Sequence, residues 1–491
     1  MQFIKNTCLC LIILFIITTK HTHADENPSH QMLTVTQLQS DFDALYQRLK
    51  NAHIDLYAHT NKTAYDNFFS SIKSDLNKPM SRLEAKVLFQ KFVAFGKVAH
   101  ARIDFPEVEY QEYRQAGGKI FPIFPRIIEG KTYVSENYSE NKYIKIGDEI
   151  LSVNSKAISS YLAKLSKHIS ADTQYIADSI LEFSFPKYLW LEYGEINSFD
   201  LILKSQTGHI YKASIKSLAK LDTPENRSFF TLSPTDRVVK MLTDSVGYFR
   251  PGPFYNAENP SQLWNSKYFI EFLDKAFENT FTKKAKKLII DLRLNPGGDV
   301  SFSDPIIAWF ADRSFKFNSS FKVKSSHEAD IANQKRLDGR PVDKNSISYR
   351  YAKHYNKTPY GDFFNLDFSN VKPREGDLYK GEVYVLVNRH SFSNAVTFAS
   401  IVQDYKFGII VGEKTSDMAT TYGAMETFTL PETKISVGFP KAHIVRPSGE
   451  LKNDGVKPDW TITSPIVQTQ EDVVLNKLLG MIVEKTKQSN N

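Results

Sequence analysis

The sequence predicts an α/β protein of several domains. Its 491 residues exceed the about 100–200 residues of a typical single domain. Apolar residues first follow a helical period, then alternate as in strands, and then form short runs between helical stretches, which is the pattern of a layered α/β core. We therefore expect a helical domain, a β-rich domain, an α/β core and a C-terminal helix with a tail, at residues 25–112, 113–222, 223–467 and 468–491.

Residues 1–24 have the order of a secretory signal peptide. Lys5 precedes the apolar run 8–17, and a polar stretch follows that ends in the small residue Ala24. The run is short for a membrane span, which needs about 20 residues. We expect cleavage before Asp25, export to the periplasm or the medium, and no stable membrane span in the mature protein. A retained N-terminal anchor is the alternative.

Cysteine content and charge exclude several classes of function. Both cysteines, Cys8 and Cys10, lie in this first segment, so the mature chain would have no disulfide, catalytic thiol or cysteine-bound zinc. The formal net charge of +7 is spread along the chain, and no basic block with interleaved aromatic residues indicates a nucleic-acid partner. No metal-ligand spacing, dinucleotide fingerprint or phosphate loop is present, and we expect no cofactor.

Helical periodicity runs from about residue 33 to residue 95. The first expected helix has an apolar face whose members are spaced by four, three and four residues: Leu38, Phe42, Leu45 and Leu49. A second apolar face extends from Tyr65 to Leu76. Ser81 and Glu84 have the spacing of a capping box, which predicts that a third helix starts there.

The segment 144–154 reads IKIGDEILSVN, in which a glycine-aspartate turn leads into a strand that ends in Val-Asn. This segment resembles the corresponding part of PDZ domains. The resemblance implies a PDZ-like module that receives an extended polypeptide, often by its free C-terminus, as an added strand. An unrelated β-hairpin is the alternative.

Apolar runs predict five strands in the α/β core: Val246–Arg250, Lys287–Asp291, Val383–Asn388, Gly408–Gly412 and Ile435–Phe439. A helix is expected from Asn259–Pro260, because proline suits the first helical turn. Residues 314–367 form a long, polar, aromatic-rich insertion.

Two places in the core carry residues suited to chemistry. The strand ending at Asp291 leads to Gly297–Gly298, whose backbone amides could approach an oxyanion or a phosphate, and Asp299 argues against a phosphate loop. The next strand leads through Ser391 and Ser393 into an apolar helix. A serine at this turn is either a nucleophile near a helix N-terminus or an N-cap residue.

Four ordered segments, DLRLNPGG, NRHSFSNAVTFASIVQDY, GIIVGEKT and RPSGELKNDGVKPDW, resemble those of tail-specific (C-terminal processing) serine peptidases and the related tricorn core proteases. The resemblance implies a Clp protease/crotonase-like core. It implies Ser393 as the nucleophile, with Ser391 as its competitor. It also implies oxyanion donors from the backbone amides of Gly297 or Gly298 and of Asn394.

The general base departs from the pattern of the bacterial relatives. Met418 occupies their lysine position, and Lys414 is offset by four residues. A histidine, as in the tricorn-like branch, is the alternative, since imidazole accepts a proton near neutral pH. His100 lies in FGKVAH, which resembles a GDGH segment of many relatives. His390 is the other candidate.

The acid that would orient the histidine also departs from the pattern of the relatives. Relatives carry a glutamate where this chain has Lys452, and Glu450 and Asp454 flank that position. Either one could orient His100, or both could be solvated surface charges. Glu413 is expected to be structural.

The leading hypothesis is an exported serine endopeptidase or C-terminal processing peptidase that hydrolyses peptide bonds through an acyl-enzyme on Ser393. A catalytically inactive, peptide-binding scaffold of the same fold is one alternative. A serine hydrolase of non-peptide esters or amides is another. The sequence indicates neither the substrate nor the oligomeric state.

Overall fold

The computed structural model describes residues 32–221, 232–338, 343–344, 346–467 and 469–489. The expected signal segment, with Cys8 and Cys10, lies outside these residues, as does the expected domain boundary at residue 222.

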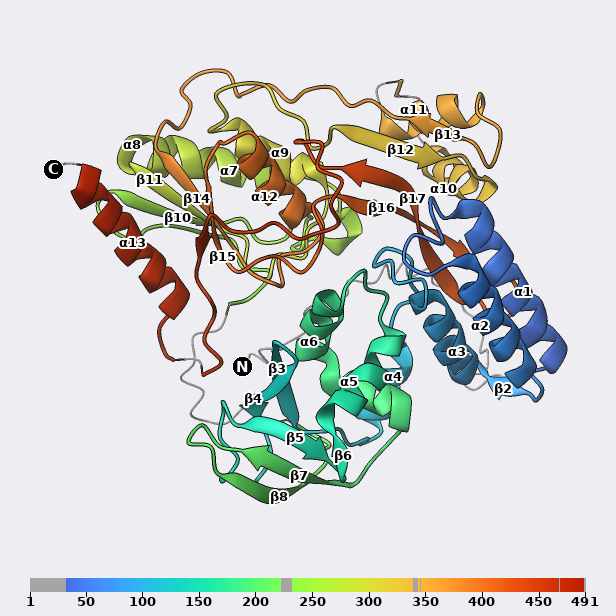
Figure 1. Ribbon diagram of the computed structural model, residues 1–491. Helices are drawn as coiled ribbons and strands as arrows, with labels where there is room; N and C mark the ends of the chain where they lie inside the picture. Colours follow the sequence, from blue (N-terminus) through green and yellow to red (C-terminus); the bar gives the residue numbers. More distant parts are fainter. Residues whose placement is uncertain (1–31, 222–231, 339–342, 345, 468, 490–491) are drawn as a thin grey trace, which may run out of the picture.

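Helices α1 (Val35–Ala52), α2 (Lys62–Asp75) and α3 (Arg82–Ala94) form the N-terminal part of the described chain (Figure 1). The short strands β1 (Met32–Leu33) and β2 (Met80–Ser81) pair with each other, and they precede α1 and α3 in the sequence. The predicted capping box is confirmed, because Ser81 Oγ accepts the Glu84 amide at 3.2 Å and Glu84 Oε2 accepts the Ser81 amide at 2.8 Å.

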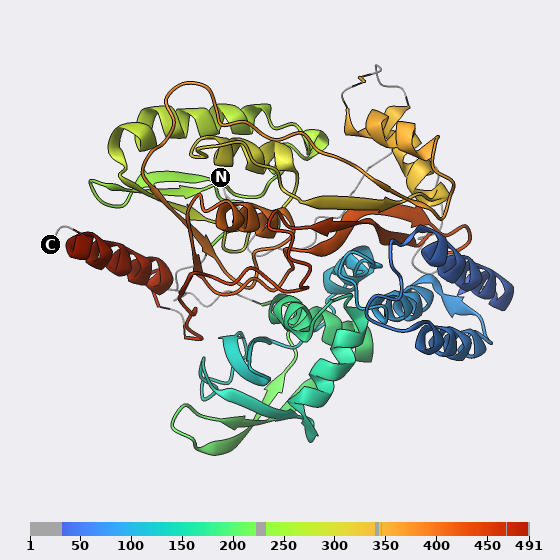
Figure 2. The ribbon, with the colours of Figure 1, turned by 45° about the horizontal axis from the view of Figure 1, so that its top comes forward.

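These helices share one apolar core with a four-stranded antiparallel sheet, instead of enclosing a core of their own. The strand order is β13-β12-β17-β16, and the blue helices lie beside this sheet in both views (Figures 1 and 2). The insertion at 314–367 supplies half of the sheet and two helices that pack beside it. The elements are β12 (Ser320–Lys324), α10 (His327–Leu337), α11 (Ile347–Tyr355), β13 (Phe363–Asn365), β16 (Thr421–Thr429) and β17 (Ser436–Val445).

The β-rich part contains a sheet in the order β3-β4-β5-β7-β8, with β6 paired to β5. Its helix α6 packs against the edge strand β3. Gly147, at φ +91°, makes the predicted turn before β5. The elements are α4 (Glu107–Gln115), β3 (Ile123–Ile128), β4 (Lys131–Asn137), β5 (Glu149–Val153), β6 (Lys156–Ala157), α5 (Ile158–Leu165), a 3-10 turn (Ser166–His168), α6 (Gln174–Tyr193), β7 (Ser198–Lys204) and β8 (Ile210–Lys216).

The α/β core is built on a six-stranded sheet in the order β18-β15-β14-β11-β10-β9, parallel except for β9. Helices α7, α9 and α12 pack on one face and α13 packs on the other; Figure 1 shows these layers. The strands are β9 (Val238–Met241), β10 (Val246–Arg250), β11 (Lys287–Asp291), β14 (Glu382–Val387), β15 (Ile409–Gly412) and β18 (Trp460–Thr461). The helical segments are Pro260–Gln262, α7 (Lys267–Ala276), Phe277–Phe281, α8 (Thr282–Lys284), α9 (Val300–Ala308), α12 (Asn394–Asp404) and α13 (Val473–Ser489).

Two sequence predictions for the core need correction. The helix expected from Pro260 is only a 3-10 turn there, and α7 begins at Lys267, whose amide is bound by the Asn265 side chain at 3.1 Å. The strand expected at Ile435–Phe439 exists as part of β17, but it joins the four-stranded sheet, because its partners are β12 and β16.

Strands β11 and β14 are parallel neighbours, with Asp291 opposite Leu386. The carboxyl ends of parallel neighbours meet at one edge of a sheet, which is where open α/β sheets hold their ligands. The loop with the paired glycines and the turn with Ser393 follow these two strands, so the topology alone brings them together.

Candidate active site

Ser393 lies on a strained turn between β14 and α12. Its φ and ψ angles are +52° and −121°, and its side chain makes no capping hydrogen bond to the helix. A non-glycine residue in such a conformation costs on the order of 1–3 kcal/mol, and strain of this kind concentrates at functional sites. Ser393 thus stands at the N-cap position of α12 without using its hydroxyl as a cap, which favours a residue held for its chemistry.

Ser391, the competing serine, has a structural role. It is fully buried. Its hydroxyl donates to the Leu292 carbonyl at 2.8 Å and accepts the Asn388 amide at 3.1 Å. These bonds join the two loops that follow β11 and β14. The hydroxyl therefore already serves both as a donor and as an acceptor.

Gly297 approaches the serine turn so closely that no side chain fits there. A Cβ at this position would lie 2.7 Å from the amide nitrogen of Asn394 and 2.8 Å from the Cβ of Ser393, and the residue has φ +85°. A Cβ at Gly298 would lie 2.1 Å from the Phe254 carbonyl oxygen. Glycine is thus required at position 297 for this loop to meet the serine turn, and at position 298 for it to pack against the segment after β10.

The amides at this meeting point differ in availability. The Gly297 amide donates to Asn295 Oδ1 at 2.8 Å. The amides of Gly298 and Asn394 donate to no acceptor within the described part of the chain. Two free amides beside a serine can stabilise a developing oxyanion, and this geometry favours Gly298 over Gly297 as the first donor.

His100 reaches the serine turn from the loop after α3. Its ring centroid lies 6.2 Å from that of Phe392, the residue before Ser393. The loop is held by Asp172, whose Oδ2 accepts the Ala99 amide at 2.9 Å. Within the described residues, His100 Nδ1 is buried and has no hydrogen-bond partner.

Asp417 also lies at the turn, although no motif in the sequence points to it. Its Oδ2 accepts the Ser393 amide at 2.5 Å. Burial raises the pKa of Asp417 overall, although the charge of His100 and the bound amides oppose the shift. The nearest sequence signal was Met418 beside it, in the lysine position of the relatives.

The two residues considered around that lysine position have contacts of their own. Met418 is buried and packs in the apolar core of the β-rich part, near Phe392. Lys414 binds Asp454, with 2.9 Å between Nζ and Oδ1, and its ammonium group lies over the Tyr175 ring.

The two expected acids are engaged elsewhere. Asp454 is paired with Lys414, and its pKa is lowered overall because the hydrogen bond and charge of Lys414 outweigh the effect of burial. Glu450 has a side chain that is 53% exposed, with a 3.4 Å contact to Arg446. The structure brings Ser393, Gly297, Gly298, Asn394 and His100 together, and it directs these two carboxylates toward basic partners.

His390 belongs to a buried network of charges that connects the β-rich part to the serine turn. Its Nε2 lies 3.0 Å from Glu182 Oε2 on α6, and Glu182 Oε1 lies 3.1 Å from Arg389 Nη1. Arg126 on β3 contacts both Glu182, at 2.9 Å, and Glu413, at 3.1 Å. Burial lowers the pKa of His390, and its hydrogen bond to Glu182 opposes this shift.

Glu182 holds this network together, and the substitution Glu182→Gln is expected to lower the free energy of unfolding by about 3–5 kcal/mol, since it leaves buried cations unpaired. Burial alone would raise the pKa of Glu182, but His390, Arg126 and Arg389 lower it overall. Its stabilising effect is therefore complete above the unfolded pKa of about 4.3 and is lost as the pH falls through the folded value.

Urea unfolding measures this effect. The control is Glu140→Gln, which changes an exposed carboxylate of the same part of the chain and should shift the free energy of unfolding by less than about 0.5 kcal/mol. Equal stability of the two variants would show that the network contributes nothing.

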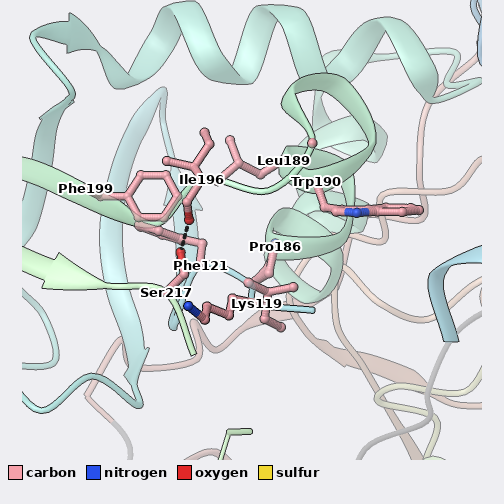
Figure 3. A pocket seen from close by; sticks show the side chains of 10 residues that line it. Lys119, Phe121, Pro186, Leu189, Trp190, Ile196, Phe199 and Ser217 are labelled. Atoms are coloured by element: carbon pink, nitrogen blue, oxygen red, sulfur yellow. Dashed lines mark hydrogen bonds between the residues drawn. The ribbon is translucent and has the colours of Figure 1, made fainter. Parts of the chain in front are cut away.

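A small crevice in the β-rich part lies away from these residues (Figure 3). The Ser217 hydroxyl donates to the Ile196 carbonyl across it. None of the residues discussed for the site lines the crevice. The lining residues are Lys119, Ile120, Phe121, Pro186, Leu189, Trp190, Gly194, Ile196, Phe199 and Ser217.

Two further properties concern only the described residues. No group of three or more His, Cys, Asp or Glu side chains there is arranged to hold a metal ion. No helix among them is long and apolar enough to cross a membrane.

Comparison with known proteins agrees with this geometry. Residues 263–462 match the sequence profile of peptidase family S41. The structure of mature CPAF complexed with lactacystin has a TM-score of 0.64 at 17% identity, and the match covers 93% of this chain and 99% of that one. Another structure of mature CPAF has a TM-score of 0.61 at 18% identity, with 87% and 92% covered.

No curated protein sequence matches the chain significantly. At these identities, the likeness to CPAF shows a shared fold, and it confirms the predicted α/β class with its Clp protease/crotonase-like core. The profile match covers β11, β14, α12 and the loops that carry the paired glycines and Ser393. The α/β core of this chain is therefore that of a serine peptidase of family S41, the tail-specific proteases.

Proposed function

We propose that the protein is an exported serine peptidase that cleaves polypeptides through an acyl-enzyme on Ser393. One observation carries the proposal: the turn presents Ser393 in a strained conformation beside the free amides of Gly298 and Asn394. A carbonyl attacked by this hydroxyl would find two donors for its oxyanion. Gly297 serves by allowing the loops to meet.

His100 is the proposed general base. The Ser393 hydroxyl attacks the scissile carbonyl carbon while its proton passes to the imidazole, and the amides bind the resulting oxyanion. The C–N bond then breaks as His100 returns the proton to the departing amine. Water, deprotonated by the same imidazole, hydrolyses the acyl-enzyme. His390 is less suited to this role, because its Nε2 is bound to Glu182.

The substrate is proposed to be an extended polypeptide, as the family match supports, recognised in part by its C-terminus, as the PDZ-like segment 144–154 suggests. Strand β3 is an edge strand, as strand addition requires. At Ile127, however, the amide is bound by Glu182 and the carbonyl by Arg389, both at 2.8 Å. A peptide that pairs along β3 at this point would have to displace these side chains.

Export is proposed from the pattern of residues 1–24 alone. Expression of the full chain in a bacterial host, followed by fractionation and N-terminal sequencing, tests it. The expected product is found outside the cytoplasm and begins at Asp25. A cytoplasmic product that retains its first residues would contradict export without affecting the proposed chemistry.

Labelling with a fluorophosphonate tests the serine chemistry. Mass spectrometry should find one phosphonate on the wild-type protein, on the peptide that contains Ser393. The labelled protein should no longer cleave an unfolded polypeptide. Comparing cleavage of matched peptides with free and with amidated C-termini tests whether the substrate's C-terminus is recognised.

A non-catalytic peptide-binding scaffold is favoured by one observation: among the described residues, the proposed base His100 has no acid hydrogen-bonded to it. Peptide binding without labelling or cleavage would support this second function and would contradict the peptidase.

A further inference from the structure

We propose that Asp417 is the residue that orients His100 and so completes the catalytic arrangement, in place of a carboxylate near position 452. This inference rests on the proposed function of Ser393 and His100. It concerns a positioning residue, because Asp417 would act on the substrate only through the imidazole.

The first observation is a pair of unsatisfied atoms. His100 Nδ1 and Asp417 Oδ1 are both buried, and neither finds a hydrogen-bond partner in the part of the chain that the structure describes. The two side chains are not hydrogen-bonded to each other in this structure. Both lie at the serine turn, Asp417 on the Ser393 amide and His100 beside Phe392, and the charge of His100 lowers the pKa of Asp417. An Nδ1–H that donates to Oδ1 would satisfy both atoms at once, as buried polar groups generally require.

The second observation is the place of Asp417 relative to the nucleophile. Its other oxygen, Oδ2, binds the amide of Ser393 itself, and the His100 ring lies beside Phe392. The loop that carries Asp417 is fixed by Thr415, whose hydroxyl donates to the Asp417 carbonyl and accepts the Val456 amide, both at 2.9 Å. The Ser393 amide therefore holds the Asp417 carboxylate, and Thr415 holds the Asp417 backbone.

Other carboxylates near the turn are already committed. Asp172 uses Oδ1 for His59, at 3.2 Å, and Oδ2 for the Ala99 amide. Glu182 and Glu413 bind arginines. Of the carboxylates at the turn in the described residues, Asp417 is the one with an oxygen left for an imidazole.

The chemistry follows from which nitrogen carries the proton. With Nδ1–H bound to Asp417, Nε2 keeps its lone pair and can take the Ser393 proton. The buried negative charge then stabilises the imidazolium that forms. The groups facing Asp417 are His100, the amides of Ser393 and Met418, and Asp172, whose charge opposes ionisation.

The substitution Asp417→Asn separates this role from the structural one. The amide oxygen of asparagine can still accept the Ser393 amide, whereas the negative charge is lost. We expect kcat to fall by about 10²–10⁴-fold, with the larger figure seen for the equivalent change in a Ser-His-Asp peptidase. KM and the melting temperature should stay near the wild-type values. Glu450→Gln, which tests the competing position, should retain wild-type kcat.

A readout independent of turnover is the downfield proton resonance of a carboxylate-bound imidazole N–H. Wild-type protein should show it, and His100→Gln and Asp417→Asn should each remove it. If Asp417→Asn does not fold, the wild-type spectrum decides, and absence of the resonance overturns the proposal.

An active, folded Asp417→Asn with wild-type kcat overturns the positioning role and leaves the peptidase intact. A wild-type protein that neither cleaves polypeptide nor reacts with fluorophosphonate overturns the proposed function, and the positioning role with it.

Discussion

Replacing Ser393 with alanine is expected to lower kcat for polypeptide cleavage by about 10⁴–10⁶-fold, the range found when a serine peptidase loses its nucleophile. The hydroxyl makes no capping bond, so its removal should not destabilise α12. Alanine also keeps the amide that binds Asp417. Peptide affinity and the melting temperature should therefore remain near those of the wild type.

Ser391→Ala is the informative comparison, because the two serines are only two positions apart. It removes a buried hydroxyl that makes two hydrogen bonds, and we expect it to cost about 1–3 kcal/mol of stability while the protein still reacts with fluorophosphonate. If Ser393→Ala retained turnover and Ser391→Ala lost it, the nucleophile would have been assigned to the wrong serine.

Replacing His100 with alanine is expected to lower kcat by about 10²–10⁴-fold, the usual contribution of general acid–base catalysis. The rate of fluorophosphonate labelling should fall in parallel, because both reactions need the Ser393 proton to be removed. The measurement is the second-order rate of labelling followed by intact mass, together with peptide turnover.

His390→Gln provides the matched control for a histidine near the serine. Glutamine can still donate to Glu182, so the network should hold and labelling should stay within about tenfold of the wild-type rate, a limit of about 1.4 kcal/mol in the barrier. Wild-type labelling by His100→Ala, with loss in His390→Gln, would exchange the roles of the two histidines.

The parts of the fold that the sequence predicted well depend on local signals. The strands β10, β11 and β14 follow from continuous apolar runs, and the start of α3 follows from the Ser81 and Glu84 pair. The insertion at 314–367 was harder, because β12 forms only by pairing with β17, more than a hundred positions later in the chain. Such a partner leaves no periodic trace in a polar segment.

The candidate site also has features that the sequence predicts and features that only the folded chain shows. Paired glycines after one strand and a serine after the next could be placed at one sheet edge, because the strands are parallel neighbours. Sequence could not distinguish Ser391 from Ser393 by physical reasoning, since the difference lies in a backbone angle and in two hydrogen bonds. The proposed orienting acid, Asp417, could not be selected in place of Glu450 or Asp454, because only the folded loop brings it to the serine turn.

The buried ion pairs couple the position of the β-rich part to that of the serine turn. Arg389 binds the Ile127 carbonyl on β3 and lies four positions before Ser393. Movement of α6 or β3 must therefore disturb the turn or break a buried ion pair, and breaking a buried pair is costly. The Glu182→Gln variant should thus affect both stability and the rate of labelling.

A crystal structure of the protein after reaction with a peptidyl phosphonate tests the central claim most directly. The expected result is a covalent bond between Ser393 Oγ and phosphorus, with one phosphoryl oxygen within about 3.1 Å of the Gly298 and Asn394 amides, as an oxyanion site requires. A phosphonate bound to another residue, or one whose oxygen points away from both amides, would contradict the account.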